Sequence, residues 1–482
     1  MNFRDTLKKV YRLFHSHGVE KLVLPFVFSQ KRIQTVTELS TQSISPASGP
    51  LRIWFHASSA GELESLWPLI VLAGTTGNTL PQTEIVVTIL SESAWGALER
   101  LKQKLQEIGA KTVFLGYSPW EGGWGSWLDQ IQPAFFITVK YEAWPDLWVS
   151  LQERKIPLVI IGARARNSLR IAKKITELLV GDLPHLLLFP CDPQDVKDLN
   201  LLFPKAILQT VDEPRWERVF DRSRNGNARA QELAQACRFL PRPWGVIGNA
   251  WLEDLKFLSS YLKRFQGTLW IVPHDLKIEN IAKIRRFLTA NEIISVSTKG
   301  LSAEVLAFQL SQKSNRKFDD LAAVVPTILV DEMGFLSELY STADWAYVGG
   351  GFGAGIHSII EPAIYGIPIA IGPKGSKKFS EVSQLQQSGQ LTLLRDSSDV
   401  LDWLPWIDEL EFDNQDNFSR GKFSQNKRSQ DKLKQTMRRQ DKLIQDKLSQ
   451  NRLQQNKHRW KREAESRCGG ASQILYSLFQ GK

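Results

Sequence analysis

Two acidic residues each stand just beyond a run of apolar residues, where a loop would present a carboxylate at the end of a strand. Glu62 follows the apolar run 52–56, and Glu142 follows the apolar run 134–139. A carboxylate in such a place can take a proton from an attacking hydroxyl, and two on one rim can shift each other's pKa. A plainer interpretation also fits: Ser59-x-x-Glu62 is the spacing of a capping box, and Glu142 could be a solvated loop acid.

A third constellation combines glycine, histidine and acid. The apolar run 345–348 leads into a loop with five glycines, and a helical pattern over 359–365 and an apolar run over 367–371 follow. Glycines let a backbone approach a ligand closely, and the N-terminus of a helix favours phosphate. We therefore predict a binding loop for a phosphate-bearing ligand. Its residues are Gly349, Gly350, Gly351, Gly353, Gly355, His357, Ser358 and Glu361.

Two other interpretations of this loop compete with the binding loop. One is a tight strand–helix turn with a capping box formed by Ser358 and Glu361. The other is a dinucleotide fingerprint, which the Gly349-x-Gly351-x-x-Ala354 spacing resembles. That fingerprint needs an acid at the end of the next strand, and Gly372-Pro373 stands there instead.

Two further strand ends in the second half of the chain carry polar or flexible residues. These are Gly248-Asn249 and Pro273-His274, which are ordinary turn residues unless they share a domain with the glycine loop. No His, Cys or Asp cluster has metal-ligand spacing, so no metal is expected. A serine hydrolase is disfavoured, because no Gly-x-Ser-x-Gly elbow follows a strand.

The elements that would position these residues alternate between apolar strands and helical patterns. This alternation predicts parallel sheets with helices on both faces, and it occurs once before residue 225 and again after residue 240. The expected architecture is therefore α/β, with two doubly wound Rossmann-like domains facing a cleft. Ligands in such domains bind beyond the carboxyl ends of the strands.

Length and charge agree with a multidomain protein that has an anionic partner. The chain has 482 residues, three widely separated cysteines and a formal net charge of +10. Widely spaced cysteines indicate a reducing compartment. No signal peptide or bilayer-spanning segment is visible. Residues 1–35 contain a basic amphipathic pattern, which predicts either a helix in a membrane surface or one packed on the protein's own core.

Composition divides the rest of the chain into four parts. Residues 36–225 are predicted to form the first domain and 240–411 the second, and 466–482 a closing helix. Residues 412–465 are rich in Gln, Lys, Arg and Asp, which indicates a solvated insertion with some helix. A basic interaction tail is the alternative for this insertion.

Several motifs together resemble the Kdo (3-deoxy-D-manno-octulosonic acid) transferases of lipopolysaccharide synthesis. The resemblance runs in order from about residue 50 to 395. It is carried by residues 54–62, 139–145, 331–336, 347–353 and 355–363, and by Gly372-Pro373. Departures from the family pattern are Pro273-His274-Asp275, where Pro-Arg-His is common, and Ser358, where Asn is usual.

The resemblance implies a GT-B fold and a metal-independent, inverting transfer of Kdo from CMP-Kdo to a lipid A precursor. The enzyme would lie on the cytoplasmic face of the bacterial inner membrane, at an anionic membrane surface, with no nucleic-acid partner. The resemblance implies that Glu62 is the base and Glu142 a second essential acid. Ser58, Ser59 and Gly61 would lie on the acceptor side, and the second domain would bind CMP-Kdo. The donor contacts would be the glycine loop with Gly248, Asn249, Pro273, His274, His357, Ser358 and Glu361.

Two rival functions keep the same fold. One is a GT-B transferase that uses UDP- or another nucleotide sugar. The other is a non-catalytic GT-B-like binding protein, whose basic insertion contacts nucleic acid or membrane. The complete Glu62 and Glu142 motifs argue against lost activity.

Overall fold

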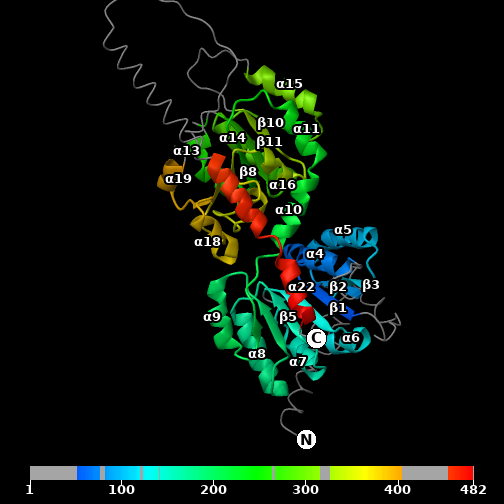
Figure 1. Cartoon of the computed structure of the whole chain (residues 1–482). Helices are drawn as coiled ribbons and strands as arrows, with labels where there is room; N and C mark the ends of the chain where they lie inside the picture. Colours follow the sequence, from blue (N-terminus) through cyan, green and yellow to red (C-terminus); the bar gives the residue numbers. More distant parts are fainter. Residues whose placement is uncertain are drawn as a thin grey trace, which may run out of the picture. The chain divides into compact units, whose positions relative to one another are not determined.

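The computed structural model describes residues 51–75, 82–119, 123–140, 142–262, 265, 267–314, 326–403 and 454–480 (Figure 1). The chain forms two compact units, one comprising residues up to Arg218 together with those from Arg467, and the other Val219–Ser466. The predicted N-terminal segment 1–35 and residues 412–453 of the predicted insertion lie outside the described residues.

The first unit is built on a seven-stranded sheet in which every described pairing is parallel. Its order is β3-β2-β1-β4-β5-β6-β7, so the chain winds one way from β1 and then restarts on the other side at β4. This reversal is the switch point of a doubly wound sheet. The strands are β1 (Leu51–Ala57), β2 (Thr83–Ile89), β3 (Thr112–Tyr117), β4 (Phe135–Val139), β5 (Leu158–Ile161), β6 (Leu186–Phe189) and β7 (Ile207–Leu208).

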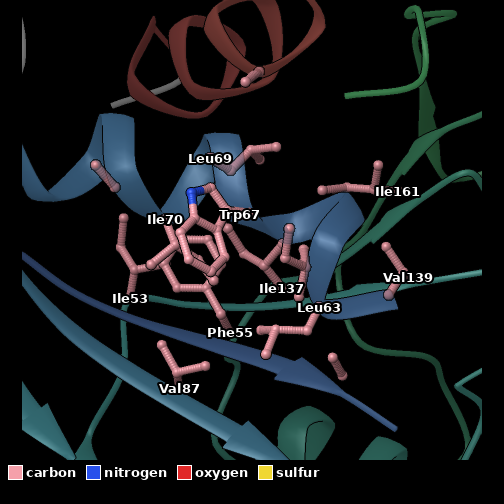
Figure 2. Packing of buried hydrophobic residues seen from close by; sticks show 14 of the residues in the cluster. Ile53, Phe55, Leu63, Trp67, Leu69, Ile70, Val87, Ile137, Val139 and Ile161 are labelled. Atoms are coloured by element: carbon pink, nitrogen blue, oxygen red, sulfur yellow. The ribbon is translucent and has the colours of Figure 1, made fainter. Parts of the chain in front are cut away.

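Helix α4 (Ala60–Gly74) covers the centre of this sheet. Figure 2 shows Leu63 and Trp67 of α4 directed at Phe55 and Ile137 of the central strands. Central parallel strands are buried on both faces, which explains why β1 and β2 read as almost continuous apolar runs. Burying these side chains fixes the start of α4, and with it the position of Glu62.

The second unit repeats the design with its own seven-stranded sheet, in the order β10-β11-β9-β8-β12-β13-β14. The order reverses between β8 and β12, which are parallel neighbours. The strands are β8 (Trp244–Ala250), β9 (Thr268–Pro273), β10 (Ser295–Ser297), β11 (Thr327–Leu329), β12 (Trp345–Val348), β13 (Ile369–Ile371) and β14 (Leu391–Leu393).

Helices connect the strands in both units. In the first they are α4, α5 (Trp95–Glu107), α6 (Trp124–Ile131), α7 (Pro145–Glu153), α8 (Asn167–Val180), α9 (Pro193–Leu202) and α22 (Gly470–Gln480), with α10 (Arg215–Asn225) leading onward. In the second they are α11 (Ala228–Ala236), α12 (Leu252–Phe257), α13 (Ser259–Leu262), α14 (Ile278–Ala290), α15 (Ala303–Ser314), α16 (Leu336–Leu339), α17 (Ile360–Ala363), α18 (Ser380–Gln387) and α19 (Ser397–Trp403).

The end of the predicted insertion is a packed helix of the second unit. Residues 454–466 are helical, Trp460 is 1% exposed in the hydrophobic core, and its indole N–H donates to the carbonyl of Ser388 at 2.9 Å. The helix expected within the 412–465 insertion is therefore present here, but its buried Trp460 and Ala464 correct the prediction that this segment is solvated. Their polar composition hid a single buried tryptophan, which anchors the helix.

One predicted helix differs in extent, because the helical pattern expected over 359–365 forms only the single turn α17. The chain then closes with α22, whose Ile474, Leu475 and Leu478 are buried in the core of the first unit.

Candidate functional site

The two predicted acids meet at the switch point of the first sheet. Strands β1 and β4 are parallel neighbours, with Ile53 opposite Phe135, so both end at the same edge. Glu62 lies in the first turn of α4, just after β1, and Glu142 follows β4. Burial, followed by the charge of Glu62, raises the pKa of Glu142, so the two carboxyls interact electrostatically at this edge.

Backbone amides hold Glu62. Its Oε2 accepts hydrogen bonds from the N–H of Ser58 at 2.8 Å and of Ser59 at 3.1 Å. The glutamate arm of the predicted capping box therefore forms. Burial raises the pKa of Glu62, while the Ser58 amide, the ammonium of Lys140 and the Ser59 amide act against this shift. The carboxylate of Glu62 therefore caps the start of α4 and is also the predicted base.

Glu142 is the more perturbed acid of the pair. It is 8% exposed, and its Oε2 accepts a hydrogen bond from the indole N–H of Trp144 at 2.6 Å. Burial, and after it the charge of Glu62, raises the pKa of Glu142 to about 7. Two carboxylates with separated pKa values are a common arrangement for acid–base chemistry.

The turn between β1 and α4 leaves this site accessible. Gly61 is exposed, and a Cβ placed on it would meet no atom within 4 Å. Ser58 and Ser59 are half-buried and contribute their backbone amides to Glu62. These three residues therefore form the rim beside the two acids.

In the second unit, the predicted donor residues come together at the carboxyl ends of β8, β9 and β12. The N–H of Gly349 donates to the carbonyl of Gly248 at 2.8 Å, and the N–H of His274 donates to the carbonyl of Ala250 at 3.1 Å. Asn249 has a φ of 52°, in the left-handed region, and interrupts the pairing of β8 with β9. The turns that the sequence analysis selected separately thus form one site.

The first glycines of the loop are required by contact between backbones. A Cβ on Gly349 would overlap the carbonyl oxygen of Asn249, and one on Gly350 would overlap that of Gly355. Gly350 also has a φ of 96°. The N–H groups of Gly353 and Gly355 donate to the carbonyl of Gly350 at 3.0 and 2.7 Å. These glycines shape the loop, and several of their amides are already used within it.

The loop also packs on residues 372–375. A Cβ on Gly351 would overlap the backbone of Gly372, the N–H of Lys374 donates to the carbonyl of Gly351 at 2.9 Å, and the N–H of Ile356 donates to the carbonyl of Lys374 at 3.0 Å. The Gly372-Pro373 motif therefore supports the loop from the next strand.

The helix that follows the loop is shorter than predicted. Helix α17 has four residues, and its N-cap is Ile359, with no side-chain capping bond. The alternative capping box of Ser358 and Glu361 is wrong in this respect. A single turn has a small macrodipole, so the expected contribution of a helix dipole to phosphate binding is correspondingly small.

An acid that the sequence analysis missed fastens the loop. Asp254, with no solvent exposure, accepts from the N–H of Gly350 at 2.7 Å, the N–H of Trp251 at 3.0 Å and the hydroxyl of Tyr347 at 3.0 Å. The sequence signal was available, because Asp254 stands three residues after Trp251, the N-cap residue of α12, which is the spacing of a capping box.

Three aromatic rings stack beside the loop. The ring centroids of Trp251 and His274 are 4.9 Å apart, and those of His274 and His357 are 4.2 Å apart. Partial desolvation lowers the pKa of the more exposed His274, and burial followed by His274 lowers the pKa of His357 to about 4. Both rings are therefore neutral near pH 7 and can meet a ligand as hydrogen-bonding groups.

The described part of the chain contains neither a metal-binding cluster nor a helix that could span a membrane. Among the residues that the structure describes, no group of three or more His, Cys, Asp or Glu side chains could hold a metal ion. Within the same residues, no helix combines the length and apolar character needed to cross a bilayer. Metal independence stays a prediction.

Comparison with known proteins then decides the family. Residues 28–210 match the family described as 3-deoxy-D-manno-octulosonic-acid transferase (kdotransferase). A 3-deoxy-D-manno-octulosonic acid transferase of Chlamydia pneumoniae is 32% identical over 386 residues, covering 75% of this chain and 78% of that protein. The chain belongs to the Kdo transferase family. Its resemblance to that family, predicted from motifs, is thereby confirmed.

Two further proteins are similar to this Kdo transferase family member over most of its length. A bifunctional glycosyltransferase/methyltransferase of Fusobacterium nucleatum is 22% identical over 359 residues, and the match covers 72% of this chain but 51% of that protein, about half its length. The structure of Anabaena Alr3699/HepE in complex with UDP matches with a TM-score of 0.51 and 9% identity, covering 89% of this chain and 99% of that one. The predicted fold class, two Rossmann-like domains of GT-B type, is confirmed.

Proposed function

We propose that this chain transfers Kdo from CMP-Kdo to a hydroxyl of a lipid A precursor, with inversion at the anomeric carbon. The observation that carries the proposal is the pairing of Glu62 with Glu142 at the switch point of the first sheet. Ligands of doubly wound domains bind at this point. Membership of the Kdo transferase family supports the identity of the sugar.

Glu62 is the general base of the proposed reaction. Its carboxylate, oriented by the amides of Ser58 and Ser59, takes the proton of the acceptor hydroxyl. The acceptor oxygen forms its bond to the anomeric carbon as the bond from that carbon to the CMP phosphate oxygen breaks. The electron pair leaves with the phosphate, and no covalent intermediate with the protein is required.

The donor side of the proposal rests on the second unit. The glycine loop, Asn249 and the ring of His357 would surround CMP-Kdo, and exposed His274 would extend the ring surface. Because both histidines are neutral near pH 7, they would stabilise the developing phosphate charge as hydrogen-bond donors.

A lipid acceptor implies a place at a membrane. We expect peripheral association with the cytoplasmic face of the inner membrane, aided by the net charge of +10 and the basic amphipathic pattern of residues 1–35. Partition of the full chain onto vesicles containing anionic lipids, compared with neutral ones, tests this expectation.

The function is tested by incubating the protein with CMP-Kdo and a lipid A precursor and counting the sugars added by mass spectrometry. Addition of Kdo is the expected result. Competition by CMP, with UDP and GDP as controls, separates this function from a transferase for another nucleotide sugar. Salt-sensitive binding to nucleic acid without transfer would instead favour the non-catalytic alternative.

A further inference from the structure

A chain of buried polar side chains lies behind Glu142. The indole N–H of Trp54 donates to the Thr88 hydroxyl oxygen at 2.8 Å, which lies 3.0 Å from Nδ1 of His56. On the other side of the same ring, Nε2 of His56 lies 3.8 Å from Oε2 of Glu142. The side chains of Trp54, His56 and Thr88 have no solvent exposure.

The strand pairing explains why these groups line up. Trp54 and His56 are two residues apart on β1 and so share one face of the sheet, and His56 stands opposite Thr88 of β2. The ring of His56 also meets the edge of Trp124, at a centroid distance of 5.3 Å and an angle of 81°. The imidazole is therefore fixed in orientation by packing as well as by hydrogen bonds.

Within this series of hydrogen-bonded side chains, each donor is directed toward the next group and finally toward Glu142. An indole nitrogen can only donate, so Thr88 accepts from Trp54 and has its own hydroxyl proton left to give. A buried hydroxyl proton without an acceptor is unfavourable, and Nδ1 of His56, 3.0 Å away, can accept it. A neutral imidazole that accepts at Nδ1 carries its proton on Nε2, which faces Glu142.

We propose that His56 is a positioning residue for the second acid: its Nε2–H is aimed at the Glu142 carboxylate and holds it in the ionised form beside Glu62. The present separation of 3.8 Å exceeds a hydrogen bond. Catalytic hydrogen bonds are often long in a site without substrate and shorten in the loaded complex. The Trp144 indole donates to the same oxygen, so two donors converge on it.

Other charged groups lie around His56 and Glu142, and their charges set how strongly ionisation of Glu142 is disfavoured. Glu62, at the start of α4, disfavours a second negative charge on Glu142. Lys140, at the end of β4, acts on Glu62 and on buried Glu213, which is also paired with Arg215. Burial and the charge of Glu62 raise the pKa of Glu142, the side chains of Ser58 and Trp144 act against this shift, and Nε2 of His56 would add a third donor on the same side.

The consequence for the reaction follows from the sign of the interaction between the two acids. An ionised Glu142 repels the charge on Glu62 and so makes Glu62 a stronger base, whereas a protonated Glu142 does not. The rate should therefore fall as Glu142 takes up its proton. This effect on rate rests on the transfer function proposed above, but the effect of His56 on Glu142 does not.

The test compares two substitutions at one position. His56→Asn can keep the bond to Thr88 but loses the group at Nε2, whereas His56→Gln can place an amide N–H at Nε2 and cannot titrate. Carboxyl infrared titration of the full-length protein, with Glu142→Gln to assign the signal, follows Glu142 directly. In His56→Asn we expect the midpoint of the Glu142 titration to move up by about one pH unit. The midpoint of the acidic side of the kcat/KM pH profile should move up with it. In His56→Gln, the midpoint of the Glu142 titration should stay within about 0.3 pH units of its value in the unsubstituted chain.

A second variant keeps the proposal testable if His56→Asn fails to fold. Thr88→Val removes the hydroxyl that orients the imidazole and should also raise the Glu142 titration, while Thr176→Val removes another fully buried hydroxyl of the same unit and should not. An unmoved titration in His56→Asn or Thr88→Val would overturn the proposal, as would equal shifts in His56→Asn and His56→Gln. If the unsubstituted protein transfers no Kdo, the proposed function fails, yet the titration still decides the role of His56.

Discussion

The N–H of Gly350 donates to Oδ2 of Asp254 at 2.7 Å, which fastens the glycine loop to helix α12. The same oxygen accepts from the N–H of Trp251 at 3.0 Å. One buried carboxylate therefore joins the ends of β8 and β12, the two strands at the switch point of the second sheet. The position of the proposed donor loop therefore depends on the Asp254 carboxylate, which lies outside the glycine motif itself.

Removing this charge should destabilise the second unit. In Asp254→Asn, the amide group would face donors where a carboxylate accepts three hydrogen bonds. We expect a loss of about 3 kcal/mol in the free energy of unfolding and a higher KM for CMP-Kdo. Denaturant unfolding measures the first and steady-state kinetics the second. Exposed Glu253→Gln, its neighbour, is the control and should stay within about 0.5 kcal/mol. Equal stability of the two variants would refute the role of Asp254.

The glycines of the loop should differ in their tolerance of a methyl group. Gly349→Ala places Cβ onto backbone atoms that have no room to move and should cost about 3 kcal/mol. Gly353→Ala should stay within about 1 kcal/mol, because the nearest atom would be the flexible Oε2 of Glu253 at 3.6 Å. Thermal unfolding of the two variants checks this contrast, and the reverse order would contradict the packing described here.

Replacing Glu142 should make the protein more stable while reducing its activity. Its pKa is about 7 in the folded chain against an ordinary value of 4.5, so the folded state binds this proton more tightly than the unfolded chain does. Stability is therefore lost as pH rises from about 4.5 to about 7. Glu142→Gln removes this penalty and should gain up to about 3 kcal/mol at about pH 8, and little at about pH 4.

The measurement for Glu142→Gln is the unfolding free energy as a function of pH. The control is Glu107→Gln, which removes a carboxylate that is 65% exposed and pairs with Lys104 on the surface, and it should change the free energy of unfolding by less than about 1 kcal/mol. A gain in stability at about pH 4 that equals the gain at about pH 8 would show that ionisation of Glu142 is not its cause.

Trp460 should be essential to the stability of the second unit, despite lying in a polar sequence. Trp460→Ala removes a side chain that is 1% exposed in the core and should cost about 4 kcal/mol. Exposed Lys461→Ala on the same helix is the matched control and should have little effect. Similar melting temperatures for the two variants would contradict the assignment of residues 454–466 to this unit.

The parts of the structure that could be predicted are those with a strong local signal. Central strands such as β1 and β12 are apolar on both faces, and the residues just after them were found because parallel strands end at one edge. The pairing of Glu62 and Glu142 also required β1 and β4 to be neighbours, which depends on strand order and not on any local pattern. The resemblance to the Kdo transferases supplied the expectation that Glu62 and Glu142 belong to one site.

The parts that escaped prediction depend on contacts between distant segments. Asp254 matters because Gly350, 96 residues later, donates to it. The glycines at 349–351 looked like a ligand cradle, but the approach of Asn249, Gly355 and Gly372 explains why they lack side chains. Trp460 and Ala464 are buried within a segment whose other described residues are mostly polar and exposed, so its composition concealed the buried face.

The most direct test of the proposed function is transfer by Glu62→Gln compared with the unsubstituted chain. Gln keeps the size of the side chain and an oxygen for the Ser58 and Ser59 amides, but it is no base at neutral pH. Mass spectrometry of the lipid A precursor after incubation with CMP-Kdo counts the sugars added, and calorimetry confirms donor binding. We predict Kdo addition by the unsubstituted protein and at least a 100-fold slower addition by Glu62→Gln, with unchanged affinity for CMP-Kdo. Near-normal addition by Glu62→Gln would contradict it.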